Sequence, residues 1–155
     1  MHPHPDAPST VPPFAQQRIL FFAMAMSVVA MTVVIGLLAN DPGPTLPGAP
    51  PPAQLPPDDP LGVFVWPFAA VHATAAFAVR RYEHGKADAA EGEARRMFRF
   101  RATLVPLALL EGGALFGLVA WLTAKNEQPG LIAALVLLAA MLAIIPLQDR
   151  DETTR

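Results

Sequence analysis

Four long apolar runs, separated by polar segments, dominate the pattern of this chain. They cover residues 19–39, 61–79, 102–124 and 130–147, and Glu111 is the only charged residue within them. Crossing the hydrocarbon core of a bilayer takes about 20 helical residues, and in lipid every backbone amide must be paired within its own segment. The pattern therefore predicts an all-α fold, a polytopic membrane protein built as a four-helix transmembrane bundle.

Polar segments divide the rest of the chain. Residues 1–17 are proline-rich and predict a disordered tail before a transmembrane domain at 18–148, and residues 149–155 form a second tail. The segment 41–60 holds nine prolines and predicts an extended outer loop, either a spacer or a ligand for an aromatic groove. A retained first span is favoured over a cleaved signal, because the tail before it carries no Lys or Arg.

Basic residues predict the orientation of the spans. Seven of the 11 Lys and Arg residues lie in the loop 80–101, and none lies between the first and second runs. By the positive-inside rule the 80–101 loop is cytoplasmic, which places both termini in the cytoplasm as well. Richness in Ala, Pro, Gly and Arg with little Lys suggests a bacterium, so we expect a multi-pass protein of the bacterial inner membrane.

Composition narrows the expected partners. The chain is 53% hydrophobic and 15% charged with a formal net charge of -2, which favours the lipid bilayer as partner and argues against nucleic acid. It has no Cys, so disulfides, thiolate metal sites and thiol nucleophiles are excluded. His2 and His4 in the first tail are interpreted as solvated residues rather than ligands, and we expect no metal and no cofactor.

Glu111 and His72 are the candidates for ion or proton binding. A carboxylate at mid-bilayer is costly unless it is protonated, paired or facing water, and Glu111 lies ten residues, or about 15 Å, from Arg101. His72 lies eight residues, or about 12 Å, from Arg80, so two consecutive antiparallel helices could bring the two side chains together. Such a pair would be either a proton or ion relay or a polar clasp between helices.

Small residues at helical spacing predict close helix packing in three of the runs. They let the backbone of another helix approach, although this pattern is common in membrane helices whatever their function. The candidates for helix packing are Gly112, Gly113, Gly117, Ala69, Ala73, Ala139 and Ala143.

The end of the basic loop contains good helix formers and predicts a helical extension of the third span beyond the membrane. Its arginines alternate with Met97, Phe98 and Phe100. They suit an interface with anionic headgroups or the rim of a protein complex, and they could also act only as a topology anchor. The candidate interfacial residues are Arg95, Arg96, Arg99 and Arg101.

The stretch from Glu111 to Val119 reads EGGALFGLV. It resembles the carboxylate-bearing helix of the proteolipid c subunits of rotary ATP synthases, and the resemblance implies that Glu111 is an ion-binding carboxylate. The likeness is local, because this chain has two further spans, a longer basic loop and no glycine-rich face in its second run. As a whole the chain more closely resembles uncharacterised small four-span bacterial membrane proteins.

Two functions are open at this stage. The first is an accessory or structural subunit of a bacterial inner-membrane complex, or a homo-oligomer, that packs through small-residue helix faces. The alternative is a proton- or ion-translocating component that uses Glu111, with or without His72. An enzyme is the less favoured class, since one Glu and one His are the only titratable residues deep in the runs.

Overall fold

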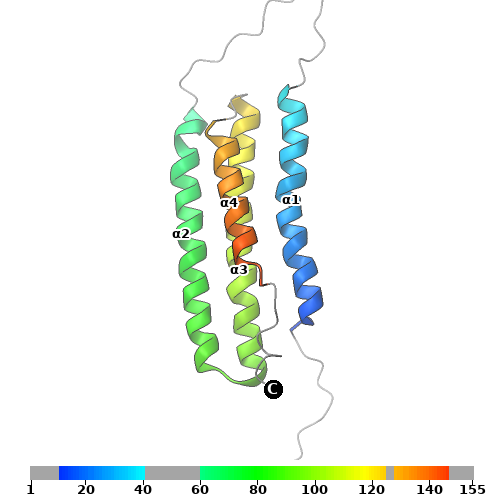
Figure 1. The fold of residues 1–155 in the computed structure, drawn as a ribbon. Helices are drawn as coiled ribbons and strands as arrows, with labels where there is room; N and C mark the ends of the chain where they lie inside the picture. The colour runs from blue at the N-terminus through cyan, green and yellow to red at the C-terminus, as the bar shows by residue number, and fades with distance from the viewer. Residues whose placement is uncertain (1–10, 41–59, 125–127, 147–155) are drawn as a thin grey trace, which may run out of the picture.

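The computed structural model describes residues 11–40, 60–124 and 128–146, which form four α-helices (Figure 1). The helices are α1 (Phe14–Asn40), α2 (Pro60–Ala89), α3 (Gly92–Ala124) and α4 (Gly130–Ile144). The prediction of an all-α fold is confirmed for these residues. Most of the predicted first tail, the outer loop up to residue 59 and the second tail lie outside the described part of the chain.

Three of the four helices are long and apolar enough to cross a membrane: α1, α2 and α3. This finding indicates a membrane protein. The fourth expected span differs from the prediction, because α4 has 15 residues and ends at Ile144. Pro146 follows Ile145 and disfavours helical backbone there, and Ile145 is extended with φ -67 and ψ 121.

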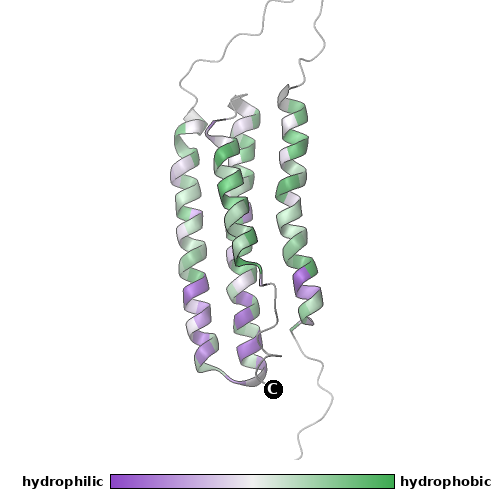
Figure 2. Cartoon of the chain, viewed as in Figure 1, coloured by the Kyte–Doolittle hydropathy of each residue, from purple (hydrophilic) through white to green (hydrophobic). Residues whose placement is uncertain are grey.

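The expected basic loop at 80–101 is mostly helical. Helix α2 continues to Ala89 and α3 starts at Gly92, so only Ala90 and Glu91 separate them in a tight helical hairpin. The predicted extension of the third span beyond its apolar run is therefore confirmed, and α2 is extended in the same way. Figure 2 shows hydrophilic residues gathered where α2 ends and α3 starts, and we call this part of the structure, residues 80–101, the basic end.

Helix α3 is the centre of the bundle. It packs against α1, α2 and α4, whereas α1 and α2 do not contact each other anywhere in the described ranges. The core along α3 includes the fully buried Leu107 and Leu118, and the other helices contribute Phe21, Val28, Val65 and Met141. At the basic end, α1 is held to α3 by stacked rings of Phe21 and Phe100, whose centroids are 6.0 Å apart.

Large apolar side chains cover the outside of the bundle as well. Ile19 on α1 and Val63 on α2 are each 71% exposed, and Leu37 on α1 is 70% exposed. Soluble monomers rarely expose apolar surface that extends continuously along several helices. The described surface is therefore suited to lipid, in agreement with the length of the three long helices.

Candidate functional site

A hydrogen bond between Ser27 and Glu111 joins α1 to α3 in the middle of their apolar stretches. The Ser27 hydroxyl and Glu111 Oε1 are the bonded atoms, and both side chains are partly buried. Ser27 lies nine residues after Arg18 and Glu111 lies ten residues after Arg101, so the two side chains are at a similar depth from the charged residues. The intramembrane carboxyl group thus has a partner within the chain.

The same hydroxyl also contacts a second acceptor. Ser27 Oγ lies 2.8 Å from the carbonyl oxygen of Met24 in its own helix. A hydroxyl has one hydrogen, so Met24 and Glu111 share it or compete for it.

His72 lies on α2 and packs against a different side of α3. Its Nδ1 is 2.9 Å from the carbonyl oxygen of Phe68, and its ring is 4.1 Å from the Phe68 ring. A Cβ built on Gly113 would lie 3.1 Å from His72 Cβ, which places His72 against the Gly113 side of α3. Residues 111 and 113 are about 200° apart around a helix, so Glu111 faces away from His72.

The expected pair of Glu111 with His72 is therefore not what the structure shows. Each side chain has its own partner, and the described residues contain no hydrogen bond or ion pair between them. The sequence analysis did not name Ser27. Ser27 and Thr32 are the only side chains in the first run that can form hydrogen bonds, and the depth of Ser27 matches that of Glu111. This match in depth is the sequence feature from which Ser27 could have been predicted as the partner of Glu111.

The candidate packing residues divide into two groups. Gly113, Gly117 and Ala69 are buried, and Ala73 packs against the core. A Cβ on Gly117 would lie 2.8 Å from the carbonyl oxygen of Gly130, so α3 and α4 meet there backbone to backbone. The second group is exposed: Gly112, Ala139 and Ala143.

The candidate interfacial arginines all lie near the start of α3. Arg96 and Arg101 are exposed, Arg95 and Arg99 are partly buried, and Arg95 Nε donates to the carbonyl oxygen of Ala90 over 2.8 Å. Arg95 thus fastens the hairpin between α2 and α3, a role that the sequence analysis did not foresee.

Lys86 is a further cation of the basic end. Its Nζ lies 4.3 Å from the Tyr82 ring centroid and 5.6 Å from that of Phe98. A side-chain hydrogen bond with Tyr82 raises the pKa of Lys86 above its ordinary value. Lys86 therefore keeps its positive charge at neutral pH, and it contributes to the basic end as the arginines do.

The described residues hold no group of three or more His, Asp or Glu side chains that could bind a metal ion. His2 and His4 lie outside those residues. Comparison with known proteins gives no match to any family model, to any curated protein or to any solved structure. The chemistry of the site therefore has to be argued from the geometry of this chain alone.

Proposed function

We propose that this protein is a non-enzymatic accessory subunit of a bacterial inner-membrane complex. The observation that carries the proposal is that some of the small residues pack between helices of this chain, whereas others lie exposed on the surface. Gly113 and Gly117 pack against other helices of this chain, whereas Gly112 has no atom within 4 Å of the position its Cβ would take. Small residues left at the surface of a membrane helix give the backbone of another helix room to approach.

The state of Glu111 supports the same class of function. Its carboxyl group is bonded to Ser27 across the α1–α3 contact, as expected for a polar clasp between two helices. A proton relay needs further polar groups leading away on both sides, and the nearest hydroxyl on α1, that of Thr32, instead donates to Val28 O of its own helix over 2.8 Å. The clasp stabilises the unit, and the exposed small faces are left for a partner.

The proposed topology has four crossings with both termini on the cytoplasmic side. Its support is the collection of Lys and Arg at the basic end, on the side where α1 also starts (Figure 2). Helix α4 is about 22 Å long at 15 residues, which is shorter than a hydrocarbon core of about 30 Å.

Size-resolved analysis of the protein in mild detergent, extracted from its native membrane, tests the proposal. We expect a stable assembly larger than one chain, which is lost in Gly112→Leu or in Ala139→Leu with Ala143→Leu. Val33→Leu is the matched control, because Val33 is 57% exposed on α1 and the change adds bulk without filling a small-residue face. A monomer in the unmodified protein, or equal loss of the assembly in the control, contradicts the proposal. The mass of the assembly distinguishes a homo-oligomer from a complex with other subunits.

A second function is favoured by one observation, the two acceptors around the single hydrogen of Ser27. A carboxyl group at mid-depth with a hydroxyl beside it also suits a proton- or ion-translocating component, as the local resemblance to proteolipid c subunits implies. Glu111→Gln separates the two functions, because the amide can still donate to Ser27 but cannot release a proton. Loss of proton flux with an intact assembly favours translocation, and normal flux with an intact assembly favours the clasp.

A further inference from the structure

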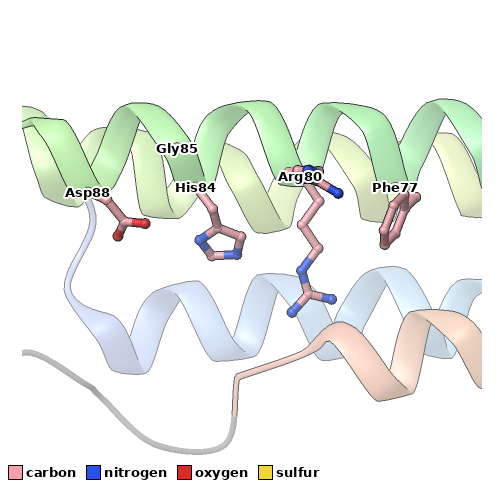
Figure 3. Close-up of a pocket in the computed structure, with 6 residues that line it drawn as sticks. Phe77, Arg80, His84, Gly85 and Asp88 are labelled. Atoms are coloured by element: carbon pink, nitrogen blue, oxygen red, sulfur yellow. The ribbon is translucent and has the colours of Figure 1, made fainter.

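A hollow at the basic end lies along one face of α2. It has a volume of about 520 Å³ and is lined by Phe77, Arg80, Arg81, His84, Gly85 and Asp88. Residues 77, 81, 84 and 88 are spaced by four, three and four, so they project from the same side of a helix. Figure 3 shows Phe77, His84 and Asp88 projecting to one side of α2, with α1 and the end of α4 across from them.

The hollow exists because of two features of the fold. Helix α4 ends at Ile144, whereas α2 continues to Ala89, so the described part of α4 does not cover the last turns of α2. Gly85 adds no side chain to the hollow, and a Cβ at that position would meet no atom within 4 Å. A volume of this size is within the range of about 300–1,000 Å³ that is usual for small-molecule sites.

The lining changes from apolar to cationic along the helix. The apolar run of α2 ends at Val79, so Phe77 lies on its apolar side and Arg80, Arg81 and His84 follow directly beyond it. The distance from Phe77 to Asp88 is about 16 Å along the axis. In the proposed topology, lipid acyl chains give way to headgroups here, and the hollow crosses this boundary.

The charges in the hollow favour an anion. Two guanidinium groups and one carboxylate line the hollow, and arginine is suited to bind phosphate oxygens through paired N–H donors. His84 adds a donor one turn further along the helix. Asp88 lies at the far end of the hollow. Its carboxylate repels a ligand whose negative charge exceeds the positive charge of the two arginines.

We propose that this hollow binds one anionic phospholipid, with the phosphate diester on Arg80 and Arg81 and the start of an acyl chain against Phe77. The recognised chemistry is a phosphate group attached to an apolar chain. A free phosphate ion would use the same arginines but would gain nothing from Phe77, and this difference is what an experiment can measure.

Native mass spectrometry of the full chain in detergent, incubated with phosphatidylglycerol and phosphatidylcholine, tests the proposal. We expect one retained phosphatidylglycerol per chain, with a preference over phosphatidylcholine. Arg80→Gln with Arg81→Gln should weaken retention at least about tenfold, because charge-assisted hydrogen bonds are lost. The matched control is Arg96→Gln with Arg101→Gln, which removes the same charge from exposed positions on α3 outside the hollow and should change retention less than about twofold.

A charge-removing variant and a competition with inorganic phosphate test the proposal further. Asp88→Asn removes the opposing charge and should strengthen retention, a gain that misfolding cannot imitate. An unchanged Asp88→Asn protein, an equal loss in the α3 control, or equal retention of the two lipids overturns the proposal. Displacement of phosphatidylglycerol by inorganic phosphate assigns the hollow to free anions and also overturns it, whereas resistance to inorganic phosphate supports the lipid.

Discussion

Ser27 in α1 and Glu111 in α3 are 84 residues apart in the chain and share a hydrogen bond in the apolar part of the bundle. Helix α1 makes no contact with α2, so its position depends on α3 and, to a lesser extent, on α4. The Ser27–Glu111 bond is therefore a specific polar link that sets where α1 lies along α3. It is the natural starting point for mutation.

Ser27→Ala should lower the free energy of unfolding by about 0.6 kcal/mol, the average for hydrogen bonds between membrane helices, and by no more than about 1.7 kcal/mol. Thr32→Val is the matched control, because the Thr32 hydroxyl donates within its own helix to Val28 and joins nothing to α3. Unfolding in detergent with increasing SDS, followed by circular dichroism, measures both variants. Equal effects of the two changes would show that the link between α1 and α3 contributes nothing specific.

Glu111→Gln should leave stability close to that of the unmodified protein, since an amide can donate to Ser27 as a protonated carboxyl group does. Glu111→Leu removes the partner and should be destabilising by an amount similar to Ser27→Ala. The double variant with Ser27→Ala should add little to Glu111→Leu, because both changes remove the same bond. The same SDS unfolding assay provides the measurement, and additive losses would contradict the assignment of Ser27 as the partner.

Gly117→Ala should destabilise the protein by about 1–3 kcal/mol, the usual cost of forcing extra volume into a packed site. The new Cβ would lie 2.8 Å from the backbone oxygen of Gly130, which cannot turn away as a flexible side chain can. Gly112→Ala is the control on the same helix, with open space around the new methyl group, and should be neutral or raise stability by about 0.5 kcal/mol. A neutral Gly117→Ala in the unfolding assay would mean that α3 and α4 are not in backbone contact.

Gly92 and Gly85 offer a second matched pair at the basic end. Gly92 has φ +56, a left-handed conformation that costs other residues about 1–2 kcal/mol, so Gly92→Ala should destabilise the hairpin by that amount. Gly85 lies inside α2 with open space at its Cβ position, and Gly85→Ala should raise stability by about 0.5–1 kcal/mol. Thermal unfolding followed by circular dichroism should separate the two variants in opposite directions.

The apolar pattern predicted the helices well, because the need to pair every backbone amide in lipid leaves few alternatives. Because Glu111 lies near the middle of the third apolar run, the pattern also predicted its place near the middle of α3. Its partner could not be predicted by pairing consecutive helices, since Glu111 and Gly113 lie on opposite sides of α3 and it is Gly113 that faces α2. Which helix occupies which side of α3 depends on contacts between distant segments, and spacing within one helix does not contain that information.

Two further differences between the sequence predictions and the structure have local causes. The charges of the 80–101 segment predict a loop whose second part is a helical extension of the third span, yet α2 also extends into it and only two residues form the turn. Charge marks where a helix leaves the membrane and does not end the helix. Ala139 and Ala143 have the spacing of a packing face, but the buried small residues of α4 are Gly130, Ala133 and Ala134. When one helix has two faces of small residues, their spacing alone does not show which face is buried within the chain.

The end of α4 at Ile144 makes the described bundle four helices wide over part of its height and three helices wide at the basic end (Figure 1). The described residues thus form a body that tapers toward the basic end. In a bilayer, we expect such a taper to displace less area from the leaflet at that end than from the opposite leaflet.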